Sequence, residues 1–235
     1  MADKLDYIEW KKWISEKFGH YNKMENVYYK KELSKCGINP SKSKILEIGF
    51  GNGSFIGWCK QNNYEIMGVE TNELLVDRCN KYGVRSFNSL KSQEILKLNG
   101  YFSVIVGFNV LEHLEKTELS EFVLTVRNLL MKNGIFIASF PNGDSPFGRI
   151  NQNGDLTHNS SIGRGTIEQL CSENNLELIN LRQPARPLIG GGLLNMIYVL
   201  VSTPFRFALE NIFRLIYFPK TKIPFDLNYI AVIRK

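Results

Sequence analysis

Three alternating glycines follow a short apolar run, 45–48, and mark the stretch best suited to hold a nucleotide-type ligand. The run predicts a buried strand, and a helix is predicted to begin at Ser54, directly after Gly49, Gly51 and Gly53. Glycine lets the backbone adopt unusual dihedral angles and come close to a ligand. Backbone N–H groups and the positive end of the helix dipole would face that ligand.

An acidic residue closes the next predicted strand, residues 65–70. Glu70 is that residue, and a carboxylate at this position can accept hydrogen bonds from both ribose hydroxyls of a nucleoside. Thr71 or Asn72 then caps a predicted helix over residues 72–82. The glycine turn and the strand-end carboxylate together predict one nucleoside site beyond the carboxyl ends of parallel strands.

The spacing of the glycines narrows the choice of cofactor. A dinucleotide fingerprint needs Gly-x-Gly-x-x-Gly, and Ser54 holds the place of its third glycine, which disfavours a nicotinamide-dependent oxidoreductase. The run Glu47-x-Gly49-x-Gly51-x-Gly53 instead resembles motif I of the class I S-adenosylmethionine (SAM) dependent methyltransferases. The resemblance implies SAM as the cofactor and S-adenosylhomocysteine as the product.

A second stretch extends the resemblance to one branch of that family. Leu111-Glu112-His113 follows a predicted strand over residues 101–108. It resembles the Leu-Glu-His stretch of the small-molecule methyltransferases related to quinone- and sugar-modifying enzymes. By this resemblance, Phe108 and Asn109 would lie beside the methionine end of SAM.

Two positions depart from the family's pattern. Ser103 replaces the usual Asp at the start of that strand, and Asn88 or Ser89 stands where an Asp often meets the adenine amino group. An asparagine can still hydrogen-bond to an adenine edge. Residues 4–36 are predicted to be helical, broken near Gly19, and would cover the cofactor through Tyr21 or His20. The residues predicted to contact the cofactor are Glu47, Gly49, Phe50, Gly51, Gly53, Glu70, Thr71, Asn88, Phe108, Asn109 and Tyr21.

His158 is the first candidate for chemistry. Asp155-Leu156-Thr157-His158 precedes a predicted helix over residues 166–174 and resembles an Asp-x-x-His element of the same branch. A histidine titrates near neutrality and suits removal of a proton from an oxygen nucleophile. His113 is the alternative base or else a structural histidine, and Asp155 would orient His158. A phosphate oxygen would need no base, and these residues would then only position it.

Strands alternate with helices from residue 44 to 181, which predicts an α/β fold with a parallel sheet covered on both faces. The resemblance implies a Rossmann-like, doubly wound sheet of seven strands whose last strand, 225–233, returns antiparallel between strands five and six. A helix over residues 117–130 is predicted to close with a left-handed cap at 132–134. A long polar loop over 143–164 is typical of a functional or mobile segment. The predicted domains are an N-terminal helical cap, 1–40, and a methyltransferase domain, 41–235.

Residues 184–224 form an apolar insertion before the last strand, in which Pro204 is predicted to open a helix that reaches Phe218. Three roles fit: a substrate lid packed on the domain, a homodimer interface, or a peripheral membrane contact through residues 193–218. Residues 188–205 carry no charge, but three glycines, Asn195 and Pro204 interrupt them, which makes a poor transmembrane span.

The net charge of +6 and the pI near 9.0 permit acidic partners. No basic run is dense enough for a nucleic-acid arm, and the Asn-Pro-Pro-aromatic motif of base-amino methyltransferases is absent, so no nucleic-acid partner is expected. The four cysteines lie far apart, which argues against a disulfide framework and structural zinc, and no metal is predicted. The charged N-terminus does not resemble a secretory signal, so a cytoplasmic protein is expected. A peripheral association with the inner face of the membrane is compatible with this location.

The acceptor is the least constrained feature. Three features favour a membrane-associated acceptor: the basic charge, the apolar insertion and the Leu-Glu-His stretch. The expected acceptor is a sugar or phosphate group of a lipid-linked glycan in surface polysaccharide biosynthesis. A quinone or another small hydrophobic acceptor is the alternative. A non-catalytic protein of the SAM-binding fold, which binds a partner through the insertion, is a third interpretation.

Overall fold

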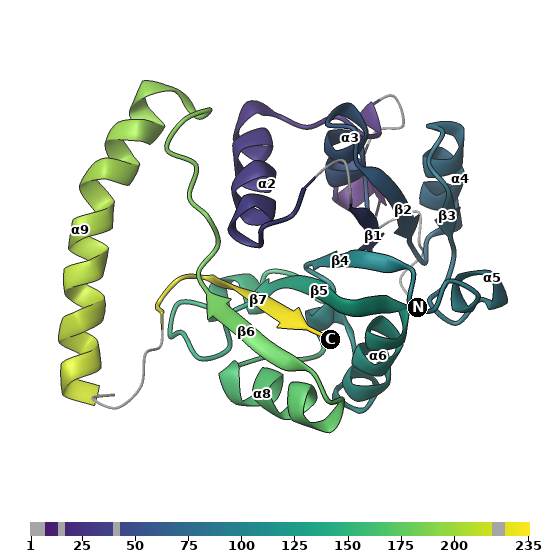
Figure 1. The fold of residues 1–235 in the computed structure, drawn as a ribbon. Coiled ribbons are helices and arrows are strands. Elements are labelled where there is room, and N and C mark those ends of the chain that lie inside the picture. Colours follow the sequence, from purple (N-terminus) through teal and green to yellow (C-terminus); the bar gives the residue numbers. More distant parts are fainter. Residues whose placement is uncertain (1–7, 14–16, 40–42, 218–223) are drawn as a thin grey trace.

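The protein is built on a mixed sheet of seven strands, seen in a computed structural model that describes residues 8–13, 17–39, 43–217 and 224–235 (Figure 1). The strands are β1 (Lys44–Ile48), β2 (Glu65–Val69), β3 (Ser86–Phe87), β4 (Phe102–Phe108), β5 (Leu130–Pro141), β6 (Glu177–Arg182) and β7 (Asn228–Arg234). Their spatial order is β3-β2-β1-β4-β5-β7-β6. All pairs are parallel except those of β7, which is antiparallel to β5 and β6. The predicted α/β sheet and its antiparallel last strand are confirmed.

Helices cover both faces of the sheet, as Figure 1 shows. The helices are α2 (Lys23–Lys35), α3 (Ser54–Gln61), α4 (Glu73–Lys81), α5 (Gln93–Leu96), η3 (Leu111–His113), α6 (Lys116–Leu129), α7 (Arg149–Gln152), α8 (Arg164–Glu173) and α9 (Gly192–Tyr217). Buried side chains of α2, α3 and α4 form one core with the sheet, and those of α6 and α8 form the other. Because both faces are covered, the central strands are apolar along nearly their whole length.

The N-terminal segment shares the core of the sheet domain. Asn22 caps α2 with a capping box, accepting from the backbone N–H groups of Met24 and Glu25, both at 2.9 Å. Trp58 of α3 donates its indole N–H to Asn26 at 2.8 Å. Tyr29 and Leu33 are buried among residues of β1 and α3. Residues 8–10 are helical, while much of the predicted helix before Gly19 lies outside the described residues.

The junction between α6 and β5 differs from the prediction. The helix ends at Leu129, and Leu130 already has extended dihedral angles and pairs with Phe102. Asn133 does adopt a positive φ of 62°, but it lies in an irregular part of β5, where its N–H donates to the Lys235 carbonyl at 3.1 Å. The left-handed residue therefore bends a strand instead of capping a helix, so the predicted cap is wrong. The loop 143–164 also contains the short helix α7.

The insertion forms one helix of 26 residues, α9, rather than a helix that begins at Pro204. Pro204 lies inside it and lacks the N–H that would complete one helical hydrogen bond. The neighbouring Thr203 donates its hydroxyl to the Val199 carbonyl at 2.5 Å. In Figure 1, α9 runs as a separate rod beside the sheet domain, and none of its residues is buried.

Candidate active site

A cavity of about 1070 Å³ lies at the carboxyl ends of β1, β2 and β4. These ends bring together the glycine turn, the strand-end carboxylate and the residues that follow β4. The segment from Asp155 to His158 and the N-terminal residues Trp10, Lys11 and Trp13 complete the wall. The cavity therefore joins segments that lie far apart in the sequence, at the edge where parallel sheets bind ligands.

The glycine turn needs all three of its glycines. Gly49, Gly51 and Gly53 have φ values of 69°, 52° and 72°, in the left-handed region that strains other residues. A Cβ added to Gly51 would lie 2.8 Å from the Trp13 ring, and one on Gly53 would lie 2.5 Å from the Phe18 ring. Gly49 and Gly51 line the cavity, whereas Gly53 stands behind them as the residue that precedes α3.

Glu70 is fixed directly across from the turn. Its Oε2 atom accepts a hydrogen bond from the Gly51 N–H at 3.1 Å. Its Oε1 atom accepts from the Thr71 N–H at 2.8 Å and from the Asn72 N–H at 3.2 Å. Glu70 and Thr71 both line the cavity. The carboxylate is thus held in place by backbone donors beside the glycine turn, where it can meet ribose hydroxyls.

Glu47 supplies a buried acidic group at the base of the cavity. Its side chain is buried, and Oε2 has no hydrogen-bond partner among the described residues. Burial, together with the nearby Glu70 carboxylate, raises the pKa of Glu47 well above its usual value. A ligand cation would relieve both effects. The ammonium group of SAM is a cation and a hydrogen-bond donor, which is what the unpartnered Glu47 Oε2 atom requires. Glu47 and the glycine turn therefore fit the cofactor.

The residues after β4 form the next part of the wall. Asn109 adopts a positive φ of 55°, an uncommon conformation for which asparagine is one of the better suited side chains. Its N–H donates to the Ser139 carbonyl at 2.9 Å, which holds it between β4 and β5. Phe108 packs edge-on against Phe55 with ring centroids 5.5 Å apart. Phe50, Phe108 and Asn109 all line the cavity.

Three predicted positions lie elsewhere. Asn88 does not line the cavity, and Ser89 and Leu90 take its place in the wall. Tyr21 turns away, because its hydroxyl donates to Gln61 at 2.6 Å on the surface of α3. His20 lies in a separate surface hollow beside Phe18 and Tyr82. The predicted roles of Asn88 and Tyr21 are therefore corrected.

The N-terminal cover reaches the cavity through residues that the sequence did not single out. Trp10, Lys11 and Trp13 line it, and so does Tyr29 of α2, whose hydroxyl is 2.8 Å from Ser54 Oγ. Lys11 also pairs with Asp155 across the cavity at 3.1 Å. The available signal was the pair Trp10 and Trp13, because large apolar side chains that lie close together on a surface mark a binding site.

His113 and His158 both line the cavity, with ring centroids 4.8 Å apart. His158 Nδ1 lies 3.0 Å from the Gln152 carbonyl, and His113 Nδ1 lies 3.2 Å from the Thr157 carbonyl. A carbonyl only accepts, so in each ring Nδ1 carries the proton and Nε2 keeps the lone pair. Burial and the neighbouring His158 lower the pKa of His113. The lowered pKa favours the neutral form of His113, which suits a base.

Asp155 does not orient His158 as predicted. It accepts from the Thr157 N–H at 3.0 Å and from the Thr157 hydroxyl at 2.6 Å, and it pairs with Lys11. Burial opposes ionisation of Asp155, but these partners outweigh it and lower its pKa to about 2. Thr157 Oγ1 has only one proton and donates it to Asp155, so it accepts from His113 Nδ1 at 2.9 Å. Asp155 therefore orients His113, through Thr157.

Glu112 lies close to the two histidines, and the Leu-Glu-His resemblance had assigned it no role of its own. Its side chain is 1% exposed, and Oε2 has no partner among the described residues. Burial, reinforced by Asp155, raises the pKa of Glu112 to about 8. Glu112, His113 and His158 offer ligand atoms within 4.8 Å of one another, a set that could hold a divalent ion. The expectation of no metal stays a prediction.

Comparisons with known proteins agree with this geometry. The sequence matches the model of a family described as a methyltransferase domain over residues 19–181, more than half of the chain. A search of curated proteins found no significant match. The solved structures show the same fold at low sequence identity.

One similar structure is a SAM-dependent methyltransferase from Archaeoglobus fulgidus, with 20% identity, coverage of 89% of this chain and 94% of the other, and a TM-score of 0.60. Another is a 1,6-didemethyltoxoflavin-N1-methyltransferase from Burkholderia thailandensis, solved with S-adenosylhomocysteine, with 11% identity, coverage of 99% and 86%, and a TM-score of 0.56. A SAM-dependent methyltransferase from Mesorhizobium loti has 13% identity, coverage of 86% and 95%, and a TM-score of 0.56. Together with the family match, this fold and this cavity show that the chain belongs to the methyltransferase-domain family and is a SAM-dependent methyltransferase.

Proposed function

We propose that this methyltransferase methylates an oxygen of a sugar or phosphate group in surface polysaccharide biosynthesis, on a lipid-linked glycan. The observation that carries the proposal is the pair of imidazoles in the cavity that the glycine turn also lines. Both His113 and His158 keep Nδ1 occupied and present Nε2. A hydroxyl acceptor needs a group that removes its proton, and a neutral imidazole suits that role near neutral pH.

SAM supplies an electrophilic methyl group when it is bound. The residues of this chain hold the reactants in line, which is the main contribution to such a displacement. The glycine turn, Glu47 and Glu70 would fix the cofactor. Nε2 of His113 or His158 would accept the proton of the attacking hydroxyl. A phosphate oxygen would attack without a base, and the histidines would then donate hydrogen bonds to it.

The polar part of the wall supports a sugar acceptor. Asn151 donates its amide to Asn228 at 2.8 Å, and both residues line the cavity near His158. Amide side chains donate and accept hydrogen bonds, as recognition of sugar hydroxyls requires. The same wall also contains apolar residues: Leu90, Leu114, Phe122 and Ile150. These residues favour a second candidate, a quinone or another small hydrophobic acceptor.

We place the activity in the cytoplasm. The four cysteines, all within the described residues, are free, and three of them are buried. Free thiols agree with a reducing compartment. SAM and nucleotide-activated sugars would both be accessible there.

The test is transfer of a labelled methyl group from SAM to three acceptors: nucleotide sugars, lipid-linked oligosaccharides and a quinol. We expect label in a sugar methyl ether or phosphate methyl ester of the lipid-linked glycans, identified by mass spectrometry. His113→Gln or His158→Gln should lower turnover of a hydroxyl acceptor by roughly 10²–10⁴-fold while leaving S-adenosylhomocysteine affinity unchanged. His20→Gln is the matched control, because His20 lies outside the cavity. Transfer to the quinol alone would replace the proposal by its alternative.

A further inference from the structure

Helix α9 presents its apolar side chains to the outside and its polar ones to the protein. The half-buried positions recur at helical spacing, and six of the eight are polar: Asn195, Met196, Val199, Ser202, Arg206, Glu210, Asn211 and Arg214. The opposite arc is apolar and ranges from 41% exposed at Phe213 to 84% at Leu194. A water-soluble surface helix has the reverse arrangement. An exposed apolar surface of this extent marks a site of association.

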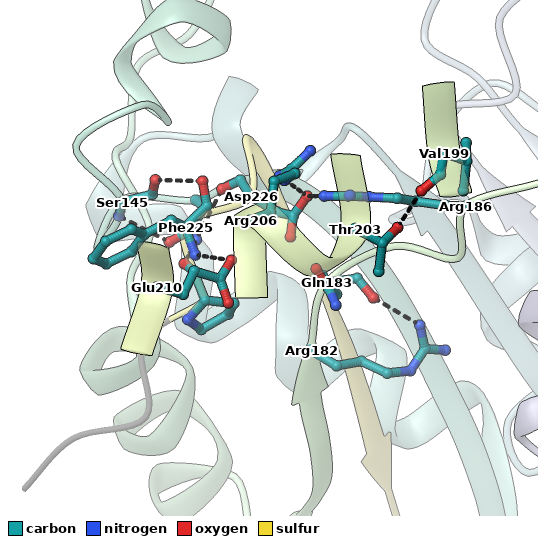
Figure 2. A network of polar contacts seen from close by, with 12 residues as sticks. Ser145, Arg182, Gln183, Arg186, Val199, Thr203, Arg206, Glu210, Phe225 and Asp226 are labelled. Atoms are coloured by element: carbon teal, nitrogen blue, oxygen red, sulfur yellow. Dashed lines mark hydrogen bonds and ion pairs between the residues drawn. The ribbon is translucent and has the colours of Figure 1, made fainter. Parts of the chain in front are cut away.

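Polar contacts fix α9 in this orientation (Figure 2). Arg206 of α9 pairs with Asp226 at 2.6 Å, and Arg186 pairs with the same carboxylate from the segment before the helix. Glu210 accepts a hydrogen bond from the Phe225 N–H at 3.2 Å. Asp226 is only 7% exposed and the two arginine side chains are 27% and 35% exposed, so the two ion pairs are partly shielded from solvent. The polar side of the helix is therefore bonded to the rest of the protein, and its apolar arc faces outward.

A transmembrane span is excluded by the topology of the sheet. By length and composition α9 could cross a bilayer, since 26 residues extend about 39 Å. It connects β6 to β7, however, and these strands pair with each other, Arg182 opposite Ile230. One crossing would leave Gly192 and Tyr217 on opposite sides of the membrane. The chain would then have to return through hydrocarbon without a partner for its backbone, which membranes do not permit.

The net charge of the chain is carried by the segment of sequence that contains this helix. Of the 29 basic and 23 acidic residues, eight basic and two acidic ones lie in residues 182–235, so this segment accounts for the whole formal charge of +6. The rest of the chain is balanced. A basic segment that carries an apolar helix complements an anionic surface with a hydrophobic interior. Two copies that met through α9 would instead bring two such segments together and repel each other.

We infer that α9 is a docking element that lies in the plane of an anionic lipid bilayer, with its apolar arc in the acyl boundary. Its aromatic residues suit that depth: Tyr198, Phe205, Phe207, Phe213 and Tyr217. None of the 26 residues of α9 lines the cavity, so the helix does not serve as a lid over it in this conformation. The docking requires no methyl transfer and stands apart from the proposed acceptor.

Docking would also orient the active site. α9 leaves β6 at its carboxyl end and returns to the start of β7, where Asn228 lines the cavity. The helix is thus attached to the same edge of the sheet as the active site. A bilayer bound to α9 would bring lipid-linked acceptors to the edge where the cavity opens. This last consequence rests on the proposed function, whereas the docking itself does not.

The experiment is flotation of the purified full-length chain with vesicles, without SAM or acceptor. Phosphatidylcholine vesicles are compared with vesicles that also contain phosphatidylglycerol, at low and raised salt. The test variant is Phe207→Glu with Leu215→Glu, at two positions 69% and 77% exposed. The matched control is Leu96→Glu with Leu124→Glu, at 42% and 43% exposed on α5 and α6, which makes the same change in charge. Thermal unfolding of each variant checks that it is folded.

We expect wild type and control to float with the anionic vesicles and to be released by salt or alkaline carbonate. The α9 variant should partition at least about tenfold less. Equal partitioning by wild type and α9 variant, or no preference for anionic vesicles, would overturn the inference. So would a wild-type dimer that ignores vesicles and becomes monomeric in the α9 variant, because the occupant would then be a second copy. Retention after carbonate would refute the in-plane arrangement.

Discussion

Replacing Glu112 by Gln should remove a pH dependence of stability that the folded protein carries. The Glu112 carboxyl is 1% exposed and has a pKa of about 8, against an ordinary value of 4.5 that applies in the unfolded chain. The folded protein therefore keeps a proton that the unfolded chain loses. The contribution of this proton to stability is complete below pH 4.5 and is lost progressively as the pH rises to about 8.

The size of the effect follows from the same two pKa values. Between them, the free energy of unfolding falls by about 1.4 kcal/mol for each pH unit. From pH 5 to pH 8 the wild type should lose up to about 4 kcal/mol through this one group. Glutamine resembles the protonated carboxyl and does not titrate. Glu112→Gln should therefore be close to wild type at pH 5 and more stable by up to that amount at pH 8.

The assay is urea unfolding of both proteins from pH 5 to pH 8, with a chelator present. The chelator matters because an ion held by Glu112, His113 and His158 would favour the ionised carboxylate. Glu47 also titrates abnormally, but it is present in both proteins and cancels in the difference. Glu94→Gln is the control, since its side chain is 72% exposed. If the wild type and Glu112→Gln differ by the same amount at every pH, burial does not hold this proton and the reasoning is refuted.

Two further predictions concern the glycine turn and the histidine pair. Gly51→Val should weaken S-adenosylhomocysteine binding by about 100-fold or more in calorimetry, because the added side chain meets Trp13 and keeps the ligand away from the backbone of the turn. The control is Gly37→Val, at a positive φ with open space around it, which should bind normally. Equal affinity of the two variants would argue against this site. His158→Gln should raise the pKa of His113, because it removes the electrostatic repulsion between the two rings. NMR can measure this pKa, since the chain has only three histidines. A pKa of His113 that does not rise would contradict the coupling of the two rings.

Local signals in the sequence located the cofactor half of the cavity. Gly49, Gly51 and Gly53 need left-handed dihedral angles at one turn, and that requirement is visible in residue type alone. Glu70 was predicted as a ribose-binding residue because it stands at the carboxyl end of the second strand, where nucleoside ligands bind. The position of β7 between β5 and β6 and its reversal came from the family resemblance, since periodicity does not reveal which strands pair.

Contacts between distant segments could not be read in the same way. Lys11 reaches Asp155 only because the chain folds back over the sheet, and no local pattern encodes that approach. Tyr21 has the spacing of a residue that faces the core, but spacing does not say which neighbour it meets, and Gln61 takes its hydroxyl. The left-handed cap predicted over residues 132–134 is wrong for the same reason: Asn133 has a positive φ, but it lies in β5, where its N–H donates to the Lys235 carbonyl.

The position of β7 between β5 and β6 has a consequence for the order of folding. β5 is synthesised well before β7, yet residues 135–141 pair on that side only with β7, and β6 has β7 as its neighbour in the sheet. The outer edge of β5 and the strand β6 therefore stay unpaired until β7 leaves the ribosome, and the apolar α9 emerges before that. Such a chain exposes its most aggregation-prone surfaces together during synthesis. A membrane that takes up α9 at this stage would shorten the exposure, and would make the bilayer a participant in folding as well as in location.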